Sequence, residues 1–157
     1  SRVSRGLGDV YKRQIFLSEV LSKILIHQQK DYHLYDFIED AIKYYDQHVF
    51  SSKFHIVFLM NLSKFLGFYP DVNNNNFQYF DLQHGFYSQT KDSDYIICDD
   101  DLECFNKILG INFDELNTLT LTLVQRKKLL DNIILYYRLH TENFVSVKSL
   151  EVLRKLF

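Results

Sequence analysis

The fold of this chain is decided by the stretch Leu62-Ser63-Lys64-Phe65-Leu66-Gly67-Phe68-Tyr69-Pro70, which is typical of a helix end. The apolar residues stop at Gly67, and glycine is preferred just past a helix because it adopts positive φ at little steric cost. Pro70 then prevents the helix from resuming. We therefore expect a helix that begins near Ser52 to end at Gly67, followed by a non-helical segment.

Amphipathic helices are predicted on both sides of this stretch, because apolar residues recur there every three or four positions. Before it, one helix carries the stripe Leu17–Leu25, and Asp31 can cap a second. After it, three pairs have capping-box spacing: Asp100 with Glu103, Asn112 with Glu115, and Thr122 with Gln125. A last helix is expected over residues 147–157.

The segment 68–97 has a different character. Asn73–Asn76 is a polar tract that favours a loop. Aromatic residues follow at 77–80, and Gln83-His84-Gly85 can turn the chain into a second short strand at Phe86. We expect a small β-hairpin here, with residues 95–97 as a possible further extended piece. The predicted fold is mainly α, with about six helices and this one small insertion.

Composition suggests one domain in the cytoplasm. The 157 residues are 46% hydrophobic and 24% charged, which is ordinary for a globular protein. No apolar run approaches the roughly 20 residues that a membrane span requires, and no secretory signal is visible.

Residues 1–14 stand apart from the remainder. The string Asp9-Val10-Tyr11-Lys12-Arg13-Gln14 resembles a translated sequencing-library adapter, so we expect residues 1–14 to be a disordered scar and residues 15–157 to form the domain. Without that segment the net charge is −5. A net-acidic chain is poorly suited to general attraction of nucleic acid.

Charge is divided unevenly along the chain. Residues 31–117 have a net charge of −10, and residues 122–157 have a net charge of +4. The basic part can be a solvated face whose cations complement a helix C-terminus. It can also be a patch for DNA phosphates or an acidic peptide. The candidate residues are Arg126, Lys127, Lys128, Arg138, His140 and Lys148.

Catalytic and metal-binding patterns are not found. Cys98 and Cys104 do not form a CxxC pair, and a structural zinc site requires four well-spaced ligands. The run Asp99–Asp101 is better suited to capping a helix than to acid–base chemistry. We therefore expect no catalytic residue, metal or cofactor. The aromatics of residues 77–87 can stack on single-stranded bases, but packing against the helical core is the preferred interpretation.

The strings around Gly67, Tyr79–Leu82, Leu135–His140 and Lys148–Leu153, taken in order, resemble the C-terminal helical region of RecO recombination mediators, especially those of Bacteroidetes. The resemblance implies a non-enzymatic role in loading a recombinase on single-stranded DNA coated with SSB, and in annealing strands. It implies RecR and the acidic C-terminal tail of SSB as partners, and a cytoplasmic, nucleoid-associated protein. Many relatives carry four zinc cysteines in the insertion, and this chain lacks them.

The family's main DNA-binding unit is an N-terminal OB-fold. This chain is expected to lack it and to be a truncated fragment. A groove for the SSB tail requires an apolar floor and a basic rim, and Lys53, Lys64 and Arg138 are candidates for that rim. The alternative interpretation is a helical protein–protein interaction module with no DNA role of its own.

Overall fold

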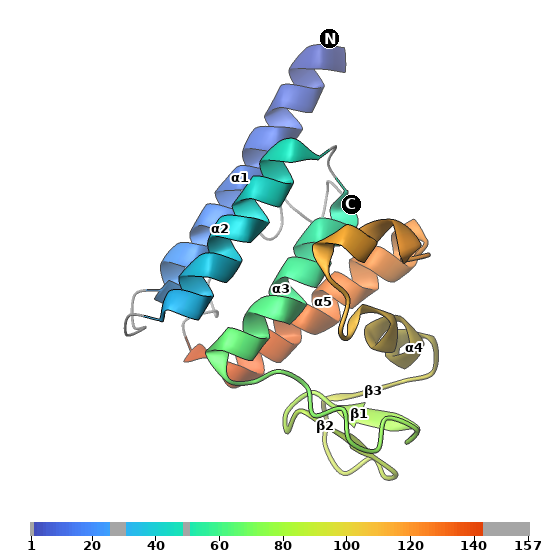
Figure 1. Ribbon diagram of the computed structural model, residues 1–157. Coiled ribbons are helices and arrows are strands. Elements are labelled where there is room, and N and C mark those ends of the chain that lie inside the picture. The colour runs from blue at the N-terminus through green and yellow to red at the C-terminus, as the bar shows by residue number, and fades with distance from the viewer. Residues whose placement is uncertain (1, 26–30, 49–50, 143–157) are drawn as a thin grey trace.

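The computed structural model describes residues 2–25, 31–48 and 51–142, and these ranges form a helical body with a small sheet at one end (Figure 1). The helices are α1 (Arg2–Leu25), α2 (Tyr32–Gln47), α3 (Ser52–Leu66), α4 (Asp99–Ile108), the 3₁₀-helix η1 (Phe113–Thr118) and α5 (Leu123–His140). The strands are β1 (Tyr79–Asp81), β2 (Phe86–Ser88) and β3 (Ile96–Cys98). The predicted mainly α fold is confirmed.

Helix α3 is the centre of the body. Every residue from Phe54 to Ser63 is buried, because α2, α5, η1 and α4 all pack against this helix. Its end is the one that the sequence predicts: Gly67 has φ 86°, and its N–H donates to the carbonyl of Lys64. The N–H of Phe68 donates to Ser63 at 3.1 Å, which closes the last turn.

Local capping signals are confirmed at several helix starts. The carboxylate of Asp31 accepts from the backbone N–H groups of His33 and Leu34. Capping boxes form at Asn112 and at Thr122. The pair Asp100 and Glu103 is wrong as a cap, since α4 begins at Asp99 with Cys98 in the N-cap position. The aspartates instead lie in the first turn, where negative charge complements the helix dipole.

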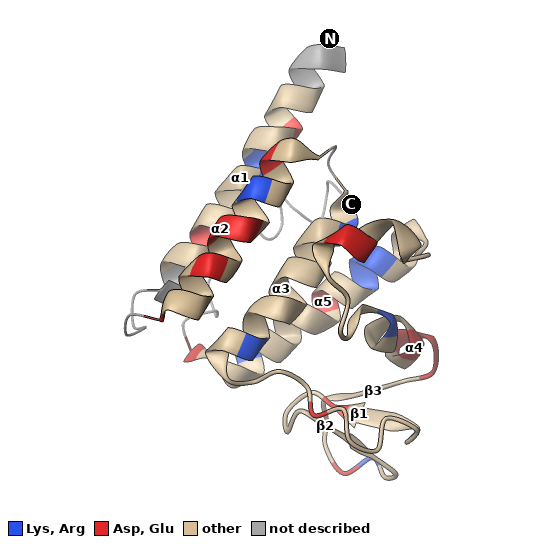
Figure 2. Ribbon diagram, viewed as in Figure 1, with Lys and Arg blue, Asp and Glu red and all other residues tan. Residues whose placement is uncertain are grey.

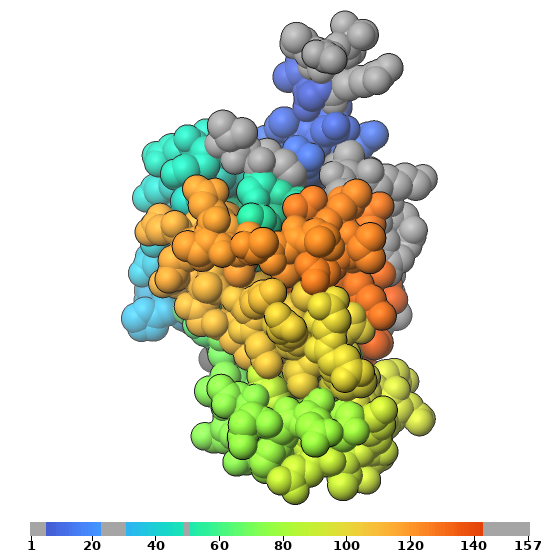
Figure 3. All heavy atoms as spheres, turned by 90° about the vertical axis from the view of Figure 1, so that its right-hand side faces the viewer, coloured from blue at the N-terminus to red at the C-terminus, as the bar shows by residue number. Residues whose placement is uncertain are grey.

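The insertion is a three-stranded antiparallel sheet with the order β2-β1-β3. The predicted hairpin is present, and the extended piece near residue 96 completes it as β3 on the other side of β1. Phe80 and Tyr87 face inward, and the ring of Phe80 lies 4.8 Å from that of Phe105 in α4. Figure 3 shows the insertion as the lower end of the molecule, below the helical body.

Residues 2–14 belong to the continuous helix α1, which differs from the disorder expected for them. The N-terminal part of α1 projects beyond the body in two views (Figures 1 and 3). The adapter origin of this segment stays a prediction. The predicted last helix at 147–157 lies outside the described residues. Among those described, no helix has the combined length and apolar character of a membrane span.

Candidate functional site

The first predicted site, the basic residues at the start of α5, is largely engaged within the fold. The Nζ of Lys128 lies 3.0 Å from a carboxylate oxygen of Asp101. The neighbouring Gln125 donates to Asp100 at 3.1 Å. Arg126 is half-buried, and its Nη1 donates to the carbonyl of Leu121. The start of α5 is therefore linked to the acidic first turn of α4 by Lys128, a candidate of the sequence analysis, and by Gln125, which was not a candidate.

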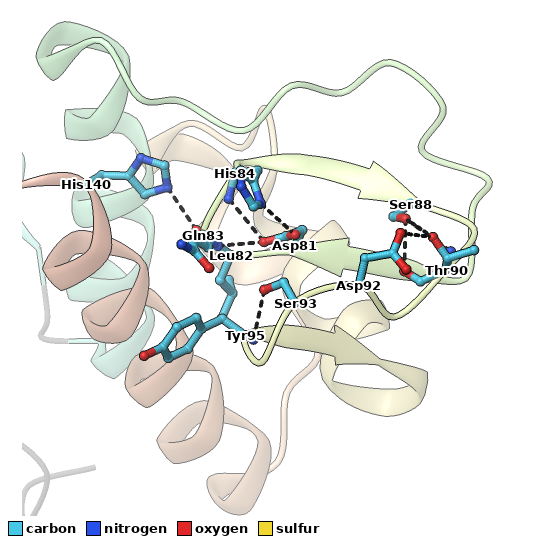
Figure 4. A network of polar contacts seen from close by, with 10 residues as sticks. All are labelled: Asp81, Leu82, Gln83, His84, Ser88, Thr90, Asp92, Ser93, Tyr95 and His140. Carbon is cyan, nitrogen blue, oxygen red and sulfur yellow. Dashed lines mark hydrogen bonds and ion pairs between the residues drawn. The ribbon is translucent and has the colours of Figure 1, made fainter.

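His140 does not lie on the basic surface. Its Nε2 donates to the carbonyl oxygen of Leu82 at 2.9 Å, which links the end of α5 to the insertion (Figure 4). Its ring stacks on Phe68 with an interplanar angle of 11°. The neighbouring Tyr136 donates to the carbonyl of Phe68 at 2.5 Å. His140 is thus a structural residue that fixes the insertion.

Lys127 and Arg138 remain as exposed cations of α5. They are 11 residues apart, which is close to a whole number of helical turns, so they share one face about 16 Å apart along the axis. Asp131 lies between them in sequence. Lys148, the last member of the predicted set, lies outside the described residues. Figure 2 shows this basic part of α5 separated from the acidic residues along α2.

Lys53 is engaged by backbone carbonyls within the fold. Its Nζ donates to the carbonyl oxygen of Leu119 at 2.5 Å and to that of Leu116 at 3.5 Å. Both carbonyls lie at the end of η1, where helical carbonyls run out of intrahelical donors, although that of Leu116 also accepts from the N–H of Leu119. Lys53 therefore caps η1 from a distance of more than 60 residues in sequence.

Lys64 does line a groove, which lies between α2, α3 and η1 and has a volume of about 440 Å³. Its walls are Phe37, Asp40, Tyr44, Asn61, Lys64, Phe65, Asn112, Phe113 and Asp114. The Nζ of Lys64 lies 4.7 Å from the centre of the Tyr69 ring. The groove thus has the predicted apolar floor, but its rim carries two aspartates against one lysine.

The insertion contains a compact polar network around Asp81 (Figure 4). This buried carboxylate accepts from the backbone N–H groups of Gln83 and His84 and from His84 Nδ1 at 2.8 Å. Burial acts to raise the pKa of Asp81, but the hydrogen bonds from His84 and the backbone outweigh it, so the pKa is lowered. Both carboxylate oxygens of Asp81 therefore accept hydrogen bonds that hold the turn between β1 and β2.

No group of three His, Cys, Asp or Glu side chains in the described ranges is arranged to hold a metal ion. Both cysteines are free thiols, with Cys104 buried and Cys98 half-buried. Burial raises the pKa of the Cys104 thiol, which disfavours the reactive thiolate. The described geometry presents surfaces and grooves for binding, and it defines the class of the molecule as a helical scaffold with a small β insertion.

Comparison with known proteins gives the family. Residues 15–151 match the family described as Recombination protein O C terminal, and the chain belongs to this family. A relative from Flavobacterium psychrophilum, named DNA repair protein RecO, is 34% identical over 143 residues, covering 91% of this chain and 60% of the relative. A relative of the same name from Azobacteroides pseudotrichonymphae is 36% identical over 150 residues, covering 91% and 61%.

A third relative, DNA repair protein RecO from Flavobacterium johnsoniae, is 32% identical over 151 residues, covering 95% of this chain and 63% of its own length. The chain therefore spans about 60% of the length of the curated relatives that it matches. No solved structure shows a significant match.

Sequence reasoning missed two features of the site. One is the role of Lys53, whose acceptors come from a distant segment. The other is the aromatic groove at Phe37 and Phe113, where rings from α2, α3 and η1 gather. The net charge of −10 over residues 31–117 was the available signal that this surface is acidic.

Proposed function

We propose that this chain acts in DNA repair and homologous recombination as the C-terminal helical part of a recombination mediator. In this role it helps to load a recombinase on SSB-coated single-stranded DNA and to anneal complementary strands, without enzymatic activity of its own. The observation that carries the proposal is the family match over residues 15–151. Relatives named DNA repair protein RecO support it.

The proposed partners are RecR and the acidic tail of SSB, in a cytoplasmic, nucleoid-associated setting. Single-stranded DNA is proposed to be bound mainly by an N-terminal OB-fold domain of the kind that the family uses. The helical domain is then the scaffold and a surface for partners. Residues 15–157 are proposed as this domain, with 68–97 as its insertion.

Lys127 and Arg138 are the proposed contacts for DNA phosphates or the acidic tail within the described surface of α5. Their exposure and shared face support this choice. Arg126 and His140 have hydrogen-bond partners within the fold, and Lys128 pairs with Asp101 at the surface, so we propose that these three residues contribute less to binding. Lys148 stays a candidate.

A titration by fluorescence anisotropy tests this surface. The labelled probes are a single-stranded oligonucleotide and a peptide with the acidic, aromatic-ended sequence of an SSB tail. We expect K127E/R138E to weaken binding about tenfold or more at low salt, since charge-assisted contacts are lost. The control K43E/K91E changes the net charge of the chain by the same amount, but at α2 and at the insertion. It should have little effect on the affinity for either probe. Equal losses in both variants would remove α5 from the proposal.

The recombination role is tested separately by strand annealing. SSB-coated complementary strands are mixed with RecR and with the chain joined to the N-terminal OB-fold domain of a relative, and duplex formation is followed with time. Acceleration over SSB and RecR alone supports the mediator role. Binding to RecR without any effect on annealing would instead favour the alternative, a helical protein–protein interaction module.

A further inference from the structure

The groove between α2, α3 and η1 has an aromatic floor made of nearly parallel rings. The Phe37 ring stacks on Phe65 at a centroid distance of 4.9 Å and an interplanar angle of 25°. It also lies 6.0 Å from Phe113, at 20°. Tyr44 continues the series, 5.5 Å from Phe113. All four side chains are only partly buried, so the groove retains aromatic surface that solvent can reach.

The rim of the same groove is acidic. Asp40 of α2 and Asp114 of η1 are exposed on its two sides. Neither carboxylate forms an ion pair with any side chain in the described ranges. The one cation of the rim, Lys64, lies over the ring of Tyr69. The surrounding residues 31–117 add a net charge of −10, which attracts cations from a distance.

Partly exposed aromatic rings beside carboxylates match one kind of side chain best. The planar guanidinium of arginine stacks on aromatic rings and pairs with carboxylates through several N–H donors. An acidic peptide would meet Asp40 and Asp114 instead, and like charges brought together oppose binding. We propose that this groove binds an arginine-bearing basic segment of a protein partner. The inference is independent of the acidic-tail surface on α5.

The test uses a fluorescein-labelled peptide with three arginines alternating with glycine, titrated into the whole chain. Two matched peptides replace arginine with lysine or with uncharged citrulline. We expect the arginine peptide to bind most tightly, the lysine peptide more weakly because it stacks less well, and the citrulline peptide weakest. Equal binding of all three would overturn the proposal.

Two double variants distinguish binding in the groove from general attraction of a basic peptide to a net-acidic chain. D40N/D114N removes the two rim charges, and D92N/D94N removes two exposed charges from the insertion. We expect the first variant to lose about tenfold in affinity, the scale of lost charge-assisted hydrogen bonds, and the second to lose less than about twofold. Similar losses in both variants would show non-specific attraction and contradict the groove.

Amide chemical shifts locate the peptide. Residues such as Asn61 and Phe113 should shift on titration in the native chain and not in D40N/D114N. If the labelled acidic tail peptide shifts these same amides and the arginine peptide does not, the groove takes the opposite charge through Lys64 and the proposal is wrong. Thermal unfolding of each variant checks that the fold is retained.

Discussion

Gly85 in the insertion and Tyr136 in α5 lie so close that a Cβ on the glycine would stand 3.0 Å from the tyrosine hydroxyl oxygen. The same hydroxyl donates to the carbonyl of Phe68. Gly85 also has φ 75°, a conformation that residues with a side chain rarely adopt. Backbone conformation and close packing therefore both require glycine at the turn that faces the helical body.

The first prediction compares this glycine with Gly67, which has φ 86° but open space around it. G67A should lower the free energy of unfolding by about 1 kcal/mol, through backbone strain alone. G85A should lose about 1–2 kcal/mol more, because the Tyr136 hydroxyl must also move from its hydrogen bond. Urea denaturation measures both, and equal losses would show that the contact with Tyr136 is unimportant.

A second prediction concerns the hydroxyl of Tyr137, which is buried and donates to the carbonyl of Leu59 at 2.5 Å. Y137F should lower the free energy of unfolding by about 1 kcal/mol, the net value of a buried hydrogen bond. Y35F removes a hydroxyl from a side chain that is 53% exposed and serves as the control. A loss in Y35F as large as in Y137F would contradict the assignment.

The third prediction is a dependence of stability on pH. Burial, with a smaller contribution from the charge of Arg13, lowers the pKa of His55 from 6.5 to about 3. The unfolded chain then binds a proton below pH 6.5 that the folded chain does not, so stability falls as pH falls. Between pH 7 and pH 5 the loss should be about 2 kcal/mol.

Urea midpoints at several pH values measure this loss, with H55Q as the comparison. The variant is expected to be less stable at pH 7 but to have a flatter profile between pH 7 and pH 5. The pKa of Asp81 is also lowered, so protonation of this carboxylate destabilises the fold as well. That further loss begins only below the unfolded carboxyl pKa near 4, outside the range from pH 7 to pH 5. An unchanged slope in H55Q would assign the effect to other groups.

The fourth prediction follows from Lys53. K53M keeps much of the side-chain volume but removes the donor to Leu119 and Leu116. The free energy of unfolding should fall by about 1–2 kcal/mol, and amide hydrogens of η1 should exchange faster. The control K107M removes an exposed ion pair with Glu103, which is worth little. Unchanged exchange in η1 would refute the capping role.

Sequence predicted those features that a few neighbouring residues determine. Gly67 ends α3, while Asp31 and Thr122 begin their helices, because each cap requires only groups within one turn. The Asp100 cap failed because the chain enters α4 directly from β3, so the helix starts at Asp99. The third strand was less clear in the sequence, since its pairing with β1 depends on contacts between separate segments.

The candidate site was harder to predict, because the partners of a charged side chain are set by the tertiary fold. Lys128 meets Asp101 and Lys53 meets Leu119, and neither contact has a local signature. The aromatic groove likewise draws Phe37 and Phe113 from distant segments. The family resemblance was accurate because it depends on the order of many strings along the chain.

The attachment of the insertion has a consequence for how it can vary. Tyr136 and His140 hold it through the main-chain carbonyls of Phe68 and Leu82, and every residue type offers that carbonyl. These two bonds therefore do not depend on which side chains the insertion carries at its acceptor positions. Substitutions that keep the backbone path and the inward-facing aromatics should leave the anchoring intact, so the outer surface of this small sheet is free to diverge while the helical body stays the same.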